Sequence, residues 1–538
     1  MTIQPTMMEY QLSLLGILQR AGNLFKKINI ISSTADKTLH TYTYQELYSR
    51  SKALSSALHN AGLKKGDRVA TMMWNSHVHL EAYFGIPCAG GVFHTLNFRL
   101  HADDLAFIAN HADDRFAIVD EILLPIFESF KPKTKIQRVF VANRSGKKLA
   151  KGYECYEEFI SKAPEEYTFP EIKENDACGM CYTSGTTGRP KGVVYSHRSI
   201  VLHTYCICMA DTLAISSSET LMPVVPQFHA NAWGTPFAAA MVGAKLVMPG
   251  PHMDAKSLLD LAEKEQVTVA VGVPTIWIGI LQELDKDSSR WKLSKKLRTI
   301  VGGSAMPESM IRGFFNHGID TVHAWGMTEM TPIGTVSRLR PYMDDWDEET
   351  KFYMRSKQGP SVPLVETRAI NEDGEVPWDN KTMGELQVRG PCVASNYYDA
   401  ESEKWSEDGW FGTGDVVTID EEGYIKLTDR TKDLIKSGGE WISSVDIENA
   451  LMGHPAVSEA AVISIPHPKW DERPLAAIVL KEGQEVNNEE LKVMLRKKFA
   501  KWWVPEAYVF IEEIPKTSAG KFKKSSLRET YNSWNWED

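Results

Sequence analysis

The sequence lacks the features of a membrane, secreted or nucleic-acid-binding protein. No apolar run reaches the roughly 18–20 residues of a membrane span, and the longest candidate, near Val267–Leu281, is interrupted by Gly272, Pro274 and Gly279. The first residues, MTIQPTMMEYQLSL, do not have the basic-then-apolar layout of a secretory signal. A net charge of −10 argues against nucleic-acid binding, which depends on a basic face. We therefore expect a cytoplasmic protein without a transmembrane segment or a nucleic-acid partner.

Cysteine is sparse, which argues against a disulfide framework. The seven Cys residues are an odd number and are scattered from Cys88 to Cys392. Cys178 and Cys181 have the CxxC spacing of a metal site, but their flanks are apolar and strand-like. Structural zinc usually occupies short loops with paired ligands, so we interpret these thiols as buried core residues.

Short β-prone runs separated by helical stretches predict an α/β chain with largely parallel sheets. Apolar residues have helical spacing over Leu47–Leu63 and Lys256–Glu265. The β-prone runs are Phe116–Val119, Gln137–Val141, Ala244–Met248, Thr268–Gly272, Thr299–Val301 and Thr321–Trp325.

The texture of the sequence changes twice towards its end. After Gly384, GELQVRG and DVVTIDEEGYIKLTD predict antiparallel strands. The acidic stretch Asp344–Thr350 is predicted to be a solvated loop. A strand ends in a charged turn at Asp429, so we predict a large domain over residues 1–428, a boundary at Asp429 and a small domain over residues 430–538.

The stretch Tyr182–Gly192, YTSGTTGRPKG, combines features suited to binding a polyphosphate. Its glycines let the backbone approach an anion, and Lys191 adds a positive charge. Its hydroxyl donors are Thr183, Ser184, Thr186 and Thr187. The spacing of Gly185, Gly188 and Lys191 fails the Walker A pattern G-x-x-x-x-G-K-[ST], which excludes a P-loop nucleoside triphosphatase. The alternative interpretation is a flexible solvent loop rich in Ser, Thr and Gly.

Six further segments follow this loop in a specific order. They are PVVPQFHANAWG (Pro223–Gly234), VGGSAMP (Val301–Pro307), HAWGMTE (His323–Glu329), DGWFGTGD (Asp408–Asp415), LTDRTKDLIKSGGEWIS (Leu427–Ser443) and PKTSAGKFKK (Pro515–Lys524). Together with the glycine loop, they resemble the adenylate-forming superfamily, specifically its acyl-CoA synthetase branch. The resemblance spans about Thr41 to Arg528.

This resemblance implies a two-step ligation that uses ATP, a carboxylic acid and coenzyme A, with Mg²⁺ as cofactor. A carboxylate attacks the α-phosphate of ATP to give an acyl-adenylate and pyrophosphate, and the thiol of coenzyme A then displaces AMP. The implied fold has mostly parallel sheets flanked by helices, a small β-barrel-like part and a mobile C-terminal α/β domain. The resemblance also implies a hinge at Asp429 and, from long-chain relatives, a homodimer formed through the N-terminal segment.

The resemblance assigns a set of residues to the nucleotide and its metal. Glu329 is expected to bind Mg²⁺, with Thr183 as a weaker second ligand. Asp415 and Arg430 are expected to contact the ribose hydroxyls, and adenine to lie on Trp325. The expected ATP- and AMP-binding residues are Thr183, Ser184, Gly185, Thr186, Thr187, Gly188, Lys191, Gly302, Gly303, Ser304, Ala305, Trp325, Gly326, Met327, Thr328, Asp415 and Arg430.

The small domain carries the residues expected to change between the two steps. Lys521 in SAGKFKK is expected to reach the carboxylate and the α-phosphate during adenylation and to withdraw afterwards. Its neighbours Lys523 and Lys524 are predicted to be solvated charges. The expected path of the pantetheine arm and its gate are Gly438, Gly439 and Trp441.

The acyl pocket is expected around QFHANAW. His229 would flank the acyl carbonyl, and together with Lys521 and Glu329 it makes up the expected catalytic set. A wall and polar handle is the preferred role for His229, since a fatty carboxylate is already ionised at neutral pH. Trp233 lies one helical turn after His229 if the segment is helical. The expected lining residues are His229, Trp233, Gly302, Gly303, Thr331 and Pro332.

Longer strings narrow the resemblance but leave the acid open. HAWGMTEMTPIGTV, KSGGEWISSVDIE, HPKWDERPL and KWWVP resemble a group containing bacterial medium- and long-chain fatty-acid–CoA ligases and 3-methylmercaptopropionate–CoA ligases. We expect a fatty-acid–CoA ligase, with a ligase for 3-methylmercaptopropionate or another short acid as the alternative. A catalytically inactive nucleotide- or acyl-binding protein is an alternative of another class, and the intact Glu329, Asp415 and Lys521 argue against it.

Overall fold

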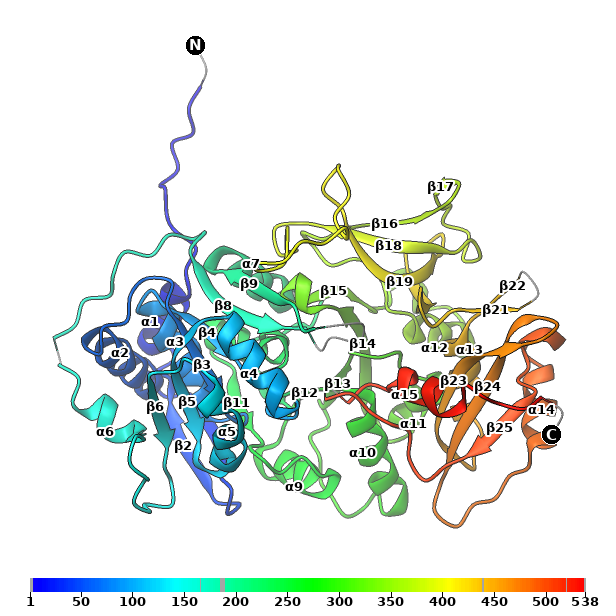
Figure 1. The fold of residues 1–538 in the computed structure, drawn as a ribbon, viewed down its shortest axis with the longest axis horizontal. Coiled ribbons are helices and arrows are strands. Elements are labelled where there is room, and N and C mark those ends of the chain that lie inside the picture. Colours follow the sequence, from blue (N-terminus) through cyan, green and yellow to red (C-terminus); the bar gives the residue numbers. More distant parts are fainter. Residues whose placement is uncertain (1–2, 165, 184–188, 438–439, 519, 537–538) are drawn as a thin grey trace.

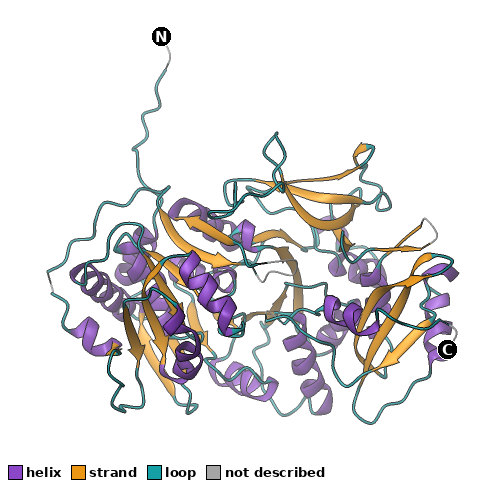
Figure 2. Cartoon of the chain, in the orientation of Figure 1, coloured by secondary structure: helices purple, strands orange, loops and turns teal. Residues whose placement is uncertain are grey.

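The computed structural model describes residues 3–164, 166–183, 189–437, 440–518 and 520–536. These residues form four sheets: two large, mostly parallel ones, an antiparallel one and one in the C-terminal region (Figure 1). Helices surround the two large sheets, whereas the antiparallel sheet is bordered mainly by loops (Figure 2). The predicted α/β class, with a large N-terminal and a small C-terminal part, is confirmed.

The first large sheet has seven strands in the order β7-β6-β5-β3-β4-β8-β9. The strands are β3 (Arg68–Met72), β4 (Val92–Thr95), β5 (Asp114–Asp120), β6 (Arg138–Ala142), β7 (Glu154–Cys155), β8 (Ala177–Tyr182) and β9 (Gly192–Ser196). All neighbours are parallel except β8 and β9, which form the hairpin around the glycine loop. Cys178 and Cys181 are buried in β8, as predicted.

The second large sheet has eight strands in the order β15-β14-β13-β12-β10-β11-β1-β2. The strands are β1 (Asn29–Ser33), β2 (Leu39–Thr43), β10 (Thr220–Pro223), β11 (Lys245–Met248), β12 (Val269–Gly272), β13 (Arg298–Val301), β14 (Asp320–Gly326) and β15 (Ile333–Val336). Only the terminal pairs β1–β2 and β14–β15 are antiparallel. Both predicted helices also form, and the Thr43–Glu46 capping box explains why α2 begins at Tyr44.

Fifteen helices of the described residues connect and cover the sheets. They are α1 (Leu14–Leu24), α2 (Tyr44–Asn60), α3 (His77–Cys88), α4 (Ala102–His111), α5 (Leu124–Phe130), α6 (Tyr156–Ser161), α7 (His197–Cys208), α8 (Thr235–Val242), α9 (Ala255–Glu265), α10 (Pro274–Lys286), α11 (Glu308–Asn316), α12 (Glu348–Ser356), α13 (Ser444–Met452), α14 (Asn488–Arg496) and α15 (Lys524–Tyr531). Over the residues described, none of these helices combines the length and apolarity needed to cross a bilayer.

The third sheet is antiparallel, as predicted for the region after Gly384. Its order is β17-β16-β18-β19-β20, with strands β16 (Glu366–Asn371), β17 (Gly374–Glu375), β18 (Gly384–Arg389), β19 (Phe411–Ile419) and β20 (Ile425–Arg430). The prediction of a loop over Asp344–Thr350 is wrong at its end, because α12 begins at Glu348. Asp347 caps this helix by accepting from the Thr350 amide at 2.9 Å, and the acidic first turn favours a helix start.

The C-terminal region forms a sheet of its own, covered by α13, α14 and α15. Its strands are β21 (Ile435–Ser437), β22 (Glu440–Ile442), β23 (Val457–His467), β24 (Asp471–Leu480) and β25 (Ala507–Phe510). They are ordered β22-β21-β24-β23, and β25 pairs with β24. The prediction that Lys524 is solvated is wrong: its ammonium is buried and lies 2.7 Å from the Glu448 carboxylate.

Candidate active site

The predicted site residues lie in loops that follow the carboxyl ends of parallel strands. Thr183 follows β8, Gly302 follows β13 and Gly326 ends β14. In open α/β sheets, ligands bind beyond the carboxyl ends of the strands. Thr183 from the first sheet and His229 from the second line one small cavity, of about 20 Å³, together with Thr95, Asn97 and other residues. The site therefore lies where the two large sheets meet.

The described ends of the glycine loop form a hairpin. Tyr182 pairs with Gly192, and the Thr183 amide donates to the Lys191 carbonyl at 2.9 Å. The Lys191 amide donates to the Thr183 hydroxyl at 3.2 Å. The loop residues Ser184, Gly185, Thr186, Thr187 and Gly188 lie outside the described residues, so their phosphate-binding role stays a prediction.

Glu329 is buried, and Tyr397 connects it to the glycine loop. Glu329 lies in the short turn after β14, and the Tyr397 hydroxyl donates to its Oε1 at 2.5 Å. Lys191 Nζ lies 4.8 Å from the centroid of the Tyr397 ring, a cation–π contact. Sequence reasoning missed Tyr397, because it stands outside all the quoted motifs.

Glu329 suits a magnesium ion that is shared with a nucleotide. Mg²⁺ in such sites usually keeps waters and phosphate oxygens and takes only one or two carboxylates. Within the described ranges, no group of three His, Cys, Asp or Glu side chains could form a metal site made of protein ligands alone. The donor set, Glu329 with the Thr183 hydroxyl beside the predicted phosphate loop, fits an ion that takes its other ligands from a nucleotide and water.

Asp415 is held between an indole and a guanidinium. It lies on β19 opposite Arg430 on β20, and its Oδ1 is 3.4 Å from Arg430 Nε. Its Oδ2 accepts from Trp325 Nε1 at 2.9 Å. Trp325 is 8% exposed and packs against Gly334, so its ring orients Asp415. Stacking of adenine on Trp325 stays a prediction.

Lys521 of the small domain reaches this site. A Cβ built on Gly303 would lie 3.8 Å from Lys521 Cε. The pKa of Lys521 is lowered to about 8: burial and the charge of Arg430 lower it, and the charges of Asp415 and Glu329 oppose the shift. Lys521 lies in the segment between β25 and α15. Its charge therefore interacts with charged residues of β19, β20 and the turn after β14. The segment around α15 is drawn in red near β13 in Figure 1.

Gly302 and Gly303 lie against Trp233, and the role of all three as acyl-pocket lining stays a prediction. A Cβ on Gly302 would lie 2.7 Å from the Ala324 carbonyl oxygen and 3.1 Å from Trp233 Cη2, so only glycine fits. Gly303 has φ +85°, a conformation that favours glycine. Ser304 and Ala305 continue this loop and are half-buried.

Trp233 lies in a left-handed turn. The sequence places it one ordinary helical turn after His229, and the structure does not have that right-handed turn. Ala230, Asn231, Ala232 and Trp233 have φ of 42°, 60°, 49° and 57°. Each such non-glycine residue costs about 1–2 kcal/mol relative to the right-handed form, and such outliers cluster at functional sites. Burial lowers the pKa of His229 to about 3, with Lys521 and Arg99 adding to it, so His229 is neutral at physiological pH.

Thr331 and Pro332 are buried in the segment between β14 and β15, and their role as lining of the acyl pocket stays a prediction. The Thr331 hydroxyl donates to the Cys392 carbonyl at 2.7 Å, and the Met327 amide donates to the Pro332 carbonyl at 2.9 Å.

His203 on α7 connects this segment to the left-handed turn that ends at Trp233. Its Nε2 accepts from the Ile333 amide at 3.2 Å, and its ring lies 2.8 Å from a Cβ built on Gly234. No motif indicated His203.

The predicted hinge residue Asp429 is bound to the small domain. Its buried carboxylate accepts from the Ser444 amide at 2.8 Å and from the Ser444 hydroxyl at 2.5 Å. Burial raises the pKa of Asp429, and Lys524 opposes this shift. On the predicted coenzyme A path, Trp441 is 47% exposed, whereas Gly438 and Gly439 lie outside the described residues.

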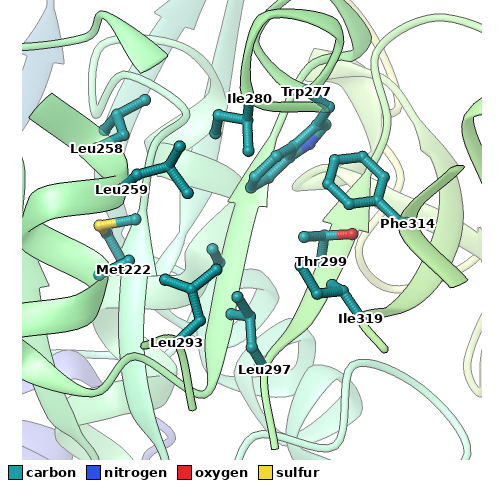
Figure 3. Close-up of a pocket in the computed structure, with 12 residues that line it drawn as sticks. Met222, Leu258, Leu259, Trp277, Ile280, Leu293, Leu297, Thr299, Phe314 and Ile319 are labelled. Atoms are coloured by element: carbon teal, nitrogen blue, oxygen red, sulfur yellow. The ribbon is translucent and has the colours of Figure 1, made fainter. Parts of the chain in front are cut away.

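An apolar cavity of about 20 Å³ lies elsewhere, between β10, β12, β13 and the helices α9, α10 and α11 (Figure 3). Leu258, Trp277 and Phe314 are among its lining residues, and Thr299 contributes the polar atom drawn there. None of the predicted site residues lines it. Its size and apolar walls are those of a packing defect in the core.

Comparison with protein families matches two descriptions. Residues 21–398 match the AMP-binding enzyme family, and residues 446–521 match the AMP-binding enzyme C-terminal domain.

Individual relatives match over nearly the full length. A long-chain-fatty-acid–CoA ligase of Thermus thermophilus is 46% identical, with 98% of this chain and 97% of the relative covered. A 3-methylmercaptopropionyl-CoA ligase of Ruegeria pomeroyi is 41% identical, with 98% of each chain covered. Among solved structures, ATP-bound MatB from Rhodopseudomonas palustris superposes with a TM-score of 0.81 at 26% identity, covering 97% of this chain and 99% of MatB.

Proposed function

The chain belongs to the AMP-binding enzyme family, and from this we propose that it is an ATP-dependent acid–thiol ligase that makes fatty acyl-CoA. The observation that carries this proposal is the position of Lys521. This lysine comes from the small domain and shares its surroundings with Glu329 and Asp415 of the large domain and with Arg430, the first residue after the predicted hinge. Such a group of charges stabilises adenylyl transfer, in which negative charge develops on phosphate oxygens.

In the first step, a carboxylate oxygen of the acid bonds to the α-phosphorus of ATP, and the bond to the bridging oxygen breaks. Pyrophosphate leaves with the electron pair of that bond. Lys521 donates hydrogen bonds to the acid and the α-phosphate as charge shifts between them. With a pKa of about 8, most Lys521 side chains are charged at pH 7.

Glu329 would hold the magnesium ion of the nucleotide, with the Thr183 hydroxyl as second ligand. When bound, the ion supplies positive charge to the β- and γ-phosphate oxygens. Tyr397 orients the Glu329 carboxylate, and Lys191 lies over the Tyr397 ring on the side of the phosphate loop. Asp415 and Arg430 would hold the ribose, Gly302–Ala305 would lie along the adenine edge, and Gly326–Thr328 would also contact the nucleotide.

In the second step, the sulfur of coenzyme A bonds to the acyl carbonyl carbon, the bond to the AMP oxygen breaks, and the thiol proton passes to solvent. We propose that residues 430–538 rotate about Asp429 between the steps, which withdraws Lys521 and admits the thiol along Gly438, Gly439 and Trp441. The Asp429 carboxylate is anchored to Ser444, so the backbone before Asp429 is where the rotation would begin.

A medium- or long-chain fatty acid is the proposed substrate, with 3-methylmercaptopropionate as the second candidate. The 3-methylmercaptopropionyl-CoA ligase is 41% identical to this chain and the long-chain-fatty-acid–CoA ligase 46%. Because the two identities are close, the short acid is the second candidate. Trp233 against Gly302 and Gly303 would form the wall that sets the length of the acid, and His229 would contact its carboxylate as a neutral group.

Cellular location and assembly are further parts of the proposal. A cytoplasmic location is supported by the cysteines, because all seven are free. A homodimer is supported by the extended N-terminal arm, where Ile3, Met7, Met8 and Tyr10 are between 74% and 93% exposed.

A panel of carboxylic acids tests the proposed function. Acids from acetate to long-chain fatty acids, and 3-methylmercaptopropionate, are incubated with ATP, Mg²⁺ and coenzyme A, and AMP and thioester are measured separately. We expect both products in equal amounts, with the highest kcat/KM for fatty acids. AMP without thioester would make the chain an adenylate-forming enzyme only, and no AMP with any acid would favour an inactive binding protein.

A further inference from the structure

The turn that carries Lys521 is internally braced. The Thr517 amide donates to the Lys521 carbonyl at 2.7 Å, and the Lys521 amide donates to the Thr517 hydroxyl at 3.1 Å. Lys516 and Phe522 form a β-bridge at the base of the turn. Any contact that fixes one residue of this turn therefore also fixes the backbone of Lys521.

Two residues of the large domain bind that turn at Ser518. Asn97 Nδ2 donates to the Ser518 hydroxyl at 2.9 Å, and Arg99 Nη1 donates to the Ser518 carbonyl at 3.2 Å. Both donors belong to the loop between β4 and α4. The Arg99 amide also donates to Asn97 Oδ1 at 3.1 Å, which couples the two residues. One residue of the small domain is thus bound at its side chain and at its backbone.

Arg99 is held in place by aromatic rings. Its guanidinium carbon lies 5.9 Å from the Trp74 ring centroid and 5.6 Å from that of Phe228, which precedes His229. Within the described part of the chain, no carboxylate lies within 4 Å of this guanidinium, so its charge is directed at the Ser518 carbonyl. Both rings belong to the large domain, so these contacts of Arg99 do not depend on the small domain.

A second surface of the large domain supports the same turn. A Cβ built on Gly520, whose φ is +81°, would lie 3.3 Å from Thr275 Oγ1 and 3.5 Å from Val273 Cγ2. These residues mark the junction of β12 and α10. The turn therefore docks between the loop after β4 and the loop after β12.

We infer that Asn97 and Arg99 are positioning residues that hold the Lys521 turn in place for acyl-adenylate formation. The inference rests on the proposed function, because it assigns Lys521 to the first step. Asn97 and Arg99 act through Ser518 rather than on the reacting atoms. Rotation of the small domain breaks both contacts, so they favour the first half-reaction alone.

Paired variants test this inference through the two half-reactions. Asn97→Ala removes one hydrogen bond and is expected to slow acyl-AMP formation roughly 2- to 10-fold, while thioester formation from supplied acyl-AMP stays within about twofold of wild type. Ser518→Ala is expected to slow acyl-AMP formation to the same extent. The double variant is expected to be no slower than either single variant, because both substitutions remove the same hydrogen bond. Equal slowing of both half-reactions, or additive losses in the double variant, would overturn the inference.

Asn110→Ala is the matched control. Asn110 lies on α4, close to the same loop in sequence, and its amide donates to the Lys133 carbonyl at 2.7 Å, within the large domain. We expect this variant to leave both half-reactions unchanged, and a loss in the first half-reaction equal to that of Asn97→Ala would contradict the inference.

Amide hydrogen exchange supplies a readout that needs no acid. In the nucleotide-free protein, the peptide covering residues 516–522 is expected to exchange faster in Asn97→Ala than in wild type or Asn110→Ala. An unchanged exchange rate in Asn97→Ala would show that Asn97 does not hold the Lys521 turn, and would overturn the inference. A wild-type protein that makes no acyl-AMP would instead refute the proposed function, and the exchange comparison would still decide whether Asn97 holds the turn.

Discussion

The ammonium group of Lys521 interacts with charges of both signs, those of Arg430, Asp415 and Glu329. Burial and Arg430 disfavour its charged form, whereas Asp415 and Glu329 favour it, and its pKa is lowered to about 8 as a result. A lysine with this pKa stays charged at neutral pH and is weakly solvated, which strengthens its interaction with a developing phosphate charge.

Replacing Lys521 with Ala is expected to reduce acyl-AMP formation by at least about 100-fold, since it removes a donor aimed at the developing charge. Thioester formation from supplied acyl-AMP should be spared, because we propose that Lys521 withdraws before that step. Pyrophosphate release and thioester formation, measured separately, check this. Equal loss in both steps would remove Lys521 from its proposed role.

The rate of acyl-AMP formation is expected to fall as pH rises through about 8, because the charged form of Lys521 is lost above its pKa. His229, with a pKa of about 3, stays neutral between pH 5 and 9 and adds no limb to the profile. Only the first half-reaction should be followed, because the thiol of coenzyme A also ionises in this range. Lys521→Arg should lose the decline while keeping some activity, and a decline that persists in that variant would assign it to another group.

The Trp233 ring occupies the space beside Gly302 and Gly303. Trp233→Ala is expected to shift kcat/KM towards longer or bulkier acids by roughly 10-fold relative to wild type. The matched control is Trp277→Ala, which removes an equally buried indole at the core cavity of Figure 3. Both changes should lower stability, but only the first should alter acid preference. An unchanged chain-length profile would count against Trp233 as a pocket wall.

At the scale of elements, β20 lies between the two predicted domains, and its last two residues make contacts in both directions. Arg430 faces Asp415 across the β19–β20 ladder, while the adjacent Asp429 binds Ser444 at the start of α13. One strand end therefore joins the nucleotide site to the small domain. Lys524 and Glu448 form a buried ion pair beside this junction, which ties α15 to α13.

Asp429→Pro is expected to slow thioester formation several-fold more than acyl-AMP formation, because proline fixes φ at the proposed pivot. Asp429→Ala serves as the comparison, since it also loses the contacts to Ser444 but leaves φ free. Single-turnover rates of each half-reaction give the measurement. A proline variant that behaves like the alanine variant, or slows both steps equally, would refute the hinge.

At the scale of the whole molecule, the two large sheets and the small domain meet around one site. The antiparallel sheet contributes Asp415 and Arg430, and the loop after β4 binds the Lys521 turn through Asn97 and Arg99. The described arrangement is therefore the one that the proposed role of Lys521 in the first step requires.

Motifs account for most of the predicted site residues, because each motif is a local string whose chemistry can be read from residue type. The glycine loop, Glu329, Asp415 and Lys521 all belong to such strings. Tyr397, His203 and Asn97 do not, since their importance comes from contacts to residues distant in the chain. Trp233 shows a third case: its residue type indicated a wall, but its left-handed backbone came only from the structure.

The sequence by itself determined the α/β class, the family resemblance and the inventory of charged and hydroxyl groups, because periodicity and short motifs are local properties. The tertiary structure alone decided which domain orientation the chain adopts, that Lys524 is buried with Glu448, and that Asn97 meets Ser518 across 421 positions. Contacts of that separation depend on how sheets and domains pack, and packing is a property of all the surfaces together.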